Sequence, residues 1–270
     1  MKKIIAFFIA TLWIYGCKKE ASLPEYNTDP VITSYLIPGN TISLQLSHQE
    51  STTSTQYSAP SLDSLNITIT SKDTIYHLVP KGNGLYTDTS LVITAGNKYS
   101  LQFTYNGKVV TASTVIPAKP VNYAQSATSI AITQITSSSS SSIGMPGGGP
   151  VDPIKLTWSN SDESYYVVVV QNMETNLVPI NDTITVVDSS RIFRNSPTTG
   201  TSYNINTRDF TYYGYHRLIL FHINADYASL YNNNSSSSQN LSTPSTGITN
   251  GVGIFTGINS DTLFLHVDKQ

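Results

Sequence analysis

Hydrophobic and polar residues alternate along much of the chain, which is the pattern of half-buried β-strands. The clearest stretch is 41–47, where every second residue is aliphatic. A second stripe of alternate apolar residues covers 99–105 and ends in Asn106-Gly107. Because Asn-Gly between two alternating runs is the strongest short-range hairpin signal, residues 109–116 are predicted to form the returning strand.

A proline-rich stretch divides this pattern into two units. Residues 117–120 read Pro-Ala-Lys-Pro, and X-Pro steps hold the chain extended. Farther along, residues 165–170 are apolar on both faces, which predicts a central strand. The spacing of Trp158 and this strand resembles that of a fibronectin type III or immunoglobulin-like sandwich. One short helix is predicted at 225–231.

These signals predict an all-β fold of two consecutive immunoglobulin/fibronectin-III-like β-sandwiches, with the one short helix in the second. The N-terminal sandwich is predicted over 31–118 and the C-terminal, fibronectin-III-like sandwich over 119–270. A Ser/Gly-rich stretch at 137–150 interrupts the second unit and is predicted to be a surface loop. No Lys-Ser or Lys-Thr follows its glycines, so the stretch does not match a P-loop.

The first residues have a different pattern. Two lysines precede an uncharged apolar run over 4–15, and Gly16-Cys17 follow it. A positive start, a short apolar core and a small residue at the cut site are the layout of a secretory signal. A membrane-spanning helix needs roughly 20 apolar residues, and this run is shorter. We therefore predict a signal peptide at 1–16.

The residues around the predicted cut resemble a lipobox, in which the cysteine becomes the lipidated N-terminus. Cys17 is the only cysteine of the chain, so no intramolecular disulfide can form, and lipidation explains the single thiol of an exported protein. An ordinary signal followed by an unrelated cysteine is the alternative. Residues 17–30 are predicted to be a lipidated tether. No cofactor is predicted besides the covalent lipid on Cys17.

The amino-acid composition excludes some classes of binding partner. Only 12% of the residues are charged, about half the usual share of soluble domains, and the net charge is -2. The chain therefore lacks the basic footprint of a nucleic-acid-binding protein. The predicted partners are the membrane, reached through the lipid anchor, and other envelope proteins. The predicted location is the outer membrane, with the periplasmic or cell-surface face left open.

The motifs of common enzymes are absent from the sequence. It contains no G-x-S-x-G nucleophile elbow, and its five histidines lack the short spacing of a zinc site. His222 and His266 lie within apolar strands and are predicted to be hydrogen-bonded structural residues. We predict no catalytic residues, no metal site and no enzymatic activity, while a hydrolase with a dispersed site remains an alternative.

A cluster of tyrosines is the one candidate ligand site. Tyr212, Tyr213 and Tyr215 flank Gly214 and could stack on sugar rings. The alternative is that the three rings pack a strand end and its loop.

Several short motifs, in this order, resemble those of the Bacteroidota lipoproteins grouped as domain of unknown function 4249. They are Ser34-Tyr35-Leu36-Ile37-Pro38-Gly39, Gly84-Leu85-Tyr86, Gly96-Asn97-Lys98-Tyr99-Ser100-Leu101, Thr114-Val115-Ile116-Pro117 and 249–257. The resemblance implies an outer-membrane lipoprotein, often encoded beside a TonB-dependent transporter, and supplies no catalytic residues. Within 249–257, the stretch Asn250-Gly251-Val252-Gly253 is predicted to be structural, because glycine permits a tight backbone path.

The leading hypothesis is a non-enzymatic accessory of a TonB-dependent transporter or envelope assembly, with a protein-protein or ligand-capture surface. The alternative is an adhesin-like surface module that binds glycan or protein directly.

Overall fold

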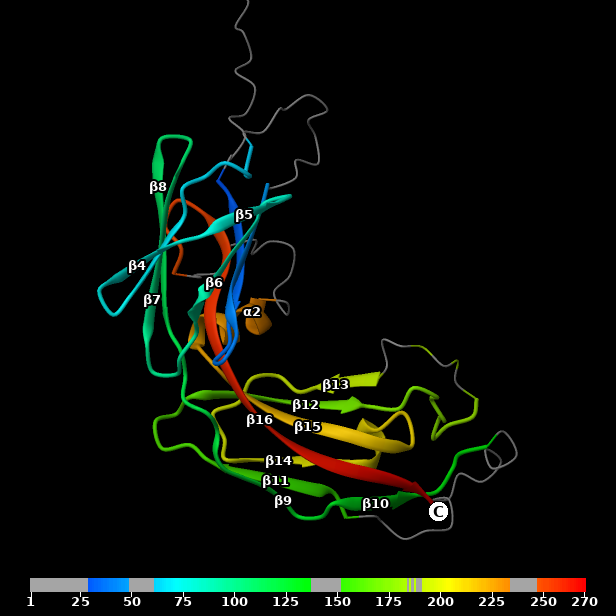
Figure 1. Cartoon of the computed structure of the whole chain (residues 1–270). Helices are drawn as coiled ribbons and strands as arrows, with labels where there is room; N and C mark the ends of the chain where they lie inside the picture. The colour runs from blue at the N-terminus through cyan, green and yellow to red at the C-terminus, as the bar shows by residue number, and fades with distance from the viewer. Residues whose placement is uncertain are drawn as a thin grey trace, which may run out of the picture.

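The computed structural model shows an all-β protein with one α-helix (Figure 1). It describes residues 29–48, 61–136, 152–183, 185, 187, 191–233 and 247–270. Cys17, the predicted signal peptide, most of the predicted tether and the predicted loop at 137–150 lie outside the described residues.

The N-terminal sandwich consists of two antiparallel sheets packed face to face. One sheet has the order β1-β2-β6-β5, with bounds Val31–Leu36, Thr41–Ser47, Leu85–Val92 and Val79–Gly82. The other has the order β4-β3-β7-β8, with bounds Thr74–His77, Thr68–Ser71, Lys98–Tyr105 and Lys108–Val115. The alternating side chains predicted to face inward in β2 and β7 are buried in one core. The Asn106-Gly107 hairpin is confirmed, since β7 pairs with β8 across it.

The C-terminal sandwich has the same two-layer arrangement. Its smaller sheet has the order β14-β11-β9, with bounds Ser202–Ile205, Ile154–Ser159 and Val121–Gln125. Its larger sheet has the order β13-β12-β15-β16, with bounds Ile192–Arg194, Tyr165–Asn172, Gly214–Ile223 and Val252–Lys269, and β10 (Ser129–Ile132) pairs with β16. Strand β12 is central, as its apolar pattern predicts. Trp158 and Tyr166 pack together in the core, with ring centroids 5.7 Å apart.

Strand β16 belongs to both sandwiches. Its first part, Val252–Gly257, pairs in parallel with β1, and the rest pairs antiparallel with β15 (Figure 1). Phe255 from this first part is buried in the N-terminal core. This differs from the predicted division, which assigned all of 119–270 to the second sandwich. Local alternation cannot reveal that one strand crosses between two cores.

The glycines at the start of β16 allow a close approach of two backbones. Gly253 has a φ of +107°, and a Cβ placed on it would lie 2.1 Å from the carbonyl oxygen of Ile32. A Cβ on Gly257 would lie 2.8 Å from Cα of Ile116. The predicted structural role of the Asn-Gly-Val-Gly stretch is therefore confirmed.

A short helix, α2 (Ala225–Asn233), lies at the junction of the sandwiches and confirms the predicted helix (Figure 1). Asn224, just before it, donates from Nδ2 to Thr114 Oγ1 (2.9 Å) and to the carbonyl oxygen of Val115 (3.0 Å), both in β8. Asp226 Oδ1 accepts a hydrogen bond of 2.9 Å from Thr256 Oγ1 in β16. Side-chain hydrogen bonds thus fix the helix to the N-terminal sandwich.

A 3₁₀ turn, η4, spans Thr207–Asp209. Within the described ranges, no helix has the length and apolar character needed to cross a membrane.

Candidate functional site

The three tyrosines singled out in the sequence have different environments. Tyr212 is 0% exposed, and its hydroxyl donates to the carbonyl oxygen of Val187 at 3.1 Å. Tyr213 is also buried, and its hydroxyl donates to the carbonyl oxygen of Ile132 at 3.0 Å. A sugar cannot reach these two rings, so the stacking role predicted for them is corrected to packing. Tyr215 is 59% exposed and stands edge-on to the His266 ring, with centroids 4.4 Å apart.

The histidines of the C-terminal sandwich are hydrogen-bonded. Nδ1 of His222 lies 2.8 Å from the carbonyl oxygen of Ala118, and Nδ1 of His266 lies 2.9 Å from Asp268 Oδ1. This confirms the structural interpretation of both residues. Among the residues that the structure describes, no three His, Cys, Asp or Glu side chains form a group that could hold a metal ion.

A concave surface lies on the outer face of the β12-β15 sheet. The inner faces of these strands fill the second core, yet their outer faces are also apolar. Val167 and Ile223 of the outer face pack near α2 as part of a small third cluster. Together with Val169, Ile219 and Phe221 of the same face, these two residues form the floor of a cleft.

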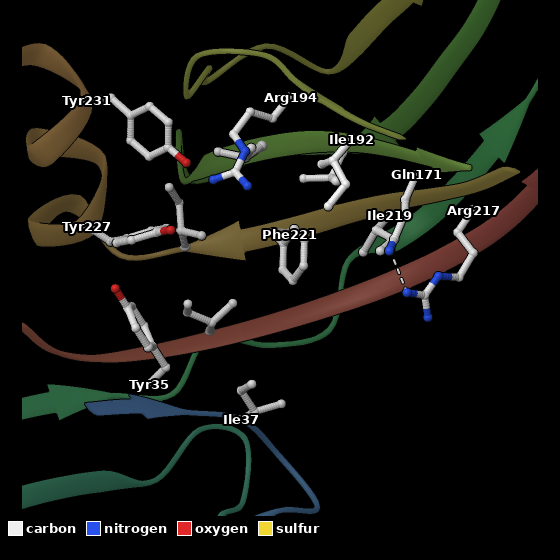
Figure 2. Close-up of a pocket in the computed structure, with 14 residues that line it drawn as sticks. Tyr35, Ile37, Gln171, Ile192, Arg194, Arg217, Ile219, Phe221, Tyr227 and Tyr231 are labelled. Atoms are coloured by element: carbon white, nitrogen blue, oxygen red, sulfur yellow. Dashed lines mark hydrogen bonds between the residues drawn. The ribbon is translucent and has the colours of Figure 1, made fainter. Parts of the chain in front are cut away.

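The cleft lies between this sheet, helix α2 and the end of β1, so all three parts of the junction contribute walls (Figure 2). Its volume is about 490 Å³, which is within the range of small-molecule sites. The lining is mostly aliphatic and aromatic, with three side chains that carry a cation or amide. The lining residues are Tyr35, Ile37, Val167, Val169, Gln171, Ile192, Arg194, Arg217, Ile219, Phe221, Ile223, Tyr227, Tyr231 and Ile258.

Three tyrosines form one end of the cleft. The rings of Tyr35 and Tyr227 meet edge-to-face at 5.7 Å, and those of Tyr227 and Tyr231 do so at 5.8 Å. Burial raises the pKa of the Tyr227 hydroxyl, a hydrogen bond with Tyr231 raises it further, and nearby Arg194 acts in the opposite direction. Burial, followed by the charge of Tyr231, also raises the pKa of Tyr35. The Tyr35 and Tyr227 hydroxyls therefore remain protonated and able to donate hydrogen bonds.

Two guanidinium groups lie in the cleft, one toward each end. Figure 2 shows Arg194 beside Tyr231 and Tyr227, whereas Arg217 lies at the opposite end against Gln171. Arg217 Nη2 donates to Gln171 Oε1 at 2.5 Å, and its buried Nε has no hydrogen-bond partner. In the described part of the chain, neither guanidinium has a carboxylate within ion-pairing distance.

This arrangement is suited to binding. The described lining contains no Ser, Cys, His, Asp or Glu, so the usual nucleophiles and general bases do not face the cleft. An apolar body can lie on the sheet, while donors at the ends orient polar groups of the ligand. This site was not predicted from the sequence. Its available signal was the loss of alternation in β12 and β15, together with an arginine placed among their outward-facing apolar residues.

The comparisons with known proteins give little further information. No family model matches the chain, and no curated protein matches it. Among solved structures, the chain is similar to the chicken CNTN1 FN1–FN3 domains, with 10% identity, 90% of this chain and 67% of that chain covered, and a TM-score of 0.28.

Proposed function

We propose that the protein is an outer-membrane lipoprotein, anchored through Cys17, that acts as a non-enzymatic accessory of a TonB-dependent transporter or another envelope assembly. The proposal assigns ligand capture to the cleft at the junction of the two sandwiches. The observation that carries it is a preformed apolar cleft of about 490 Å³ with hydrogen-bond donors at its ends and no catalytic group in its described lining. The export and lipidation signals and the motif resemblance support the location and the partner.

Anchoring and partnership are tested together on the native protein. A C-terminally tagged chain is labelled with palmitate and isolated from envelopes in non-ionic detergent, beside the Cys17→Ala variant. We expect label and membrane floatation only for the wild type, and a transporter component in its eluate. An unlabelled wild-type protein contradicts the anchor. A labelled protein that brings no transporter or assembly component contradicts the accessory role.

Capture by the cleft is tested with three probes that share a ten-carbon chain: decanoate, decanol and decyltrimethylammonium, each below its micelle concentration. The protein is a truncated chain from Lys18 onward, which lacks the lipidation cysteine and contains every described residue. We expect at least one probe to raise the melting temperature, because a ligand that binds only the folded state stabilises it. Ile192→Trp, which places an indole at the cleft wall, should reduce this shift. If no probe binds, the capture role fails.

Direct glycan binding is the second candidate function, and one observation favours it. Tyr215 and Phe264 are 59% and 60% exposed, and β-strand register places both on the outer sheet face, near the Arg217 end of the cleft. Exposed aromatic rings are suitable stacking surfaces for sugars. A glycan array with the truncated chain and its Tyr215→Ala variant tests this. Absence of binding by the wild type argues against it.

A further inference from the structure

We propose that the cleft selects amphiphilic anions, with the anionic group bound at Arg194 between Tyr227 and Tyr231 and the apolar body lying on the β12-β15 face. This inference rests on the proposed capture function and names the chemical class of its ligand.

The described lining of the cleft has cationic side chains without matching anions. Its 14 lining residues include two guanidinium groups and no carboxylate, so the described walls carry a net positive charge. In the described chain, the Arg194 guanidinium has no hydrogen bond and no ion pair, so a carboxylate or phosphate on a ligand can bind it without displacing a protein partner.

Arg194 lies beside the phenol groups of Tyr227 and Tyr231. Figure 2 shows its guanidinium directed toward the Tyr231 hydroxyl, with Tyr227 beside it. A planar guanidinium binds a carboxylate through two parallel hydrogen bonds, and phenol hydroxyls add further donors. Because no acidic side chain is in the described lining of the cleft, no protein carboxylate there competes with a ligand anion for these donors.

The two arginines of the cleft differ in how accessible their guanidinium groups are to a ligand. Arg217 Nη2 is already engaged by Gln171 Oε1 at 2.5 Å, and the Nε of the same guanidinium is buried. Arg194 lies on β13, an edge strand of its sheet, and it is exposed. Arg194 is therefore the group that an entering anion can reach. Arg217 offers a matched control, because its removal takes the same charge from the same cleft.

The surface between the two arginines is apolar and can hold the body of the ligand. Between the two arginines, Figure 2 shows Ile192, Ile219 and Phe221, and none of them carries a polar group. An inorganic anion would leave this surface in water, whereas an aliphatic or aromatic chain would cover it and gain roughly 25 cal/mol for each Å² buried. The cleft therefore selects a molecule that has both an anionic group and an apolar body.

The experiment measures dissociation constants for the same three probes by calorimetry, together with inorganic phosphate. We expect decanoate to bind at least tenfold more tightly than decanol, and decyltrimethylammonium and phosphate to bind more weakly than either. Arg194→Gln should remove the preference for decanoate and leave decanol affinity within about twofold. Arg217→Gln should lower decanoate affinity less than threefold.

Each contrary result has a distinct meaning. Equal binding of decanoate and decanol to the wild type overturns the anion preference, while capture by the cleft stands. An equal loss in Arg194→Gln and Arg217→Gln overturns the placement of the anionic group. If no probe binds, both this inference and the capture function fail. Circular dichroism of each variant checks that the fold is retained, and Arg194→Lys, which keeps the charge, should restore part of the preference.

Discussion

The conformation of single residues fixes the path of β16. Gly253 is the clearest case, because its φ of +107° and the carbonyl oxygen of Ile32 both exclude a side chain. We expect Gly253→Ala to lower the free energy of unfolding by more than about 3 kcal/mol, since backbone strain and a steric clash add together.

Gly39 is the matched control: its φ is +85°, but a Cβ there would meet nothing within 4 Å. Gly39→Ala should cost only about 1 kcal/mol. Equal losses in urea titrations would contradict the close approach.

A buried histidine gives the C-terminal sandwich a pH dependence. Burial lowers the pKa of His216 to about 4, and its Nδ1 lies 2.9 Å from the carbonyl oxygen of Gly214. In the unfolded chain the ring has its ordinary pKa of 6.5. Between these values the unfolded state binds a proton that the folded state does not. The free energy of unfolding should therefore fall as pH decreases from about 6.5 to about 4, by at most roughly 3 kcal/mol.

The contribution of this ring can be separated from that of the carboxylates. His216→Gln cannot titrate in this window and keeps an amide that can hydrogen-bond. The difference in unfolding free energy between wild type and variant, measured by urea titration at several pH values, should change across the window. Parallel curves would show that His216 is not the cause.

Helix α2 depends on a few contacts outside itself. Asn224 donates two hydrogen bonds to β8, and these connect the helix start to the N-terminal sandwich. We expect Asn224→Ala to weaken the local structure by about 1–3 kcal/mol and to accelerate amide exchange in α2 by roughly tenfold or more. Exchange in β11, whose buried side chains pack in the second core away from α2, should stay unchanged. Ser229→Ala is the control, because its hydroxyl donates only to Asp226 within the helix.

The strands and the cleft differ in how far the sequence predicts them. Strands such as β2 were predictable because alternation is a local pattern, in which every second side chain is buried. The loss of alternation over 165–170 also predicted a central strand correctly. It did not reveal the cleft, because Tyr35 and Ile37 reach that face from a strand more than a hundred residues away. The tyrosine cluster was misleading, since Tyr212 and Tyr213 look available in sequence but point into the core.

The two sandwiches share one strand, so their stabilities should be linked. β16 contributes Phe255 to the first core and Leu265 to the second, without an intervening loop. Separating the sandwiches would require breaking backbone hydrogen bonds to β1 or β15 along a continuous strand. A two-domain chain normally has a linker that few contacts cross, and this junction has the opposite character. The continuous strand therefore holds the cleft walls in place before any ligand arrives.

This linkage predicts cooperative unfolding of the truncated chain from Lys18 onward. Trp158 is its only tryptophan and lies in the second core, so its fluorescence reports that sandwich, whereas far-ultraviolet circular dichroism reports both. Leu44→Ala, in the first core, should cost about 2–5 kcal/mol and move both signals to the same lower urea midpoint. Val79 lies at an edge position and is 52% exposed. Val79→Ala should therefore change the free energy of unfolding by no more than about 0.5 kcal/mol, as judged from either signal. If the Leu44 variant leaves the Trp158 midpoint unchanged while the dichroism splits into two transitions, β16 does not couple the cores, and the cleft walls are free to move apart.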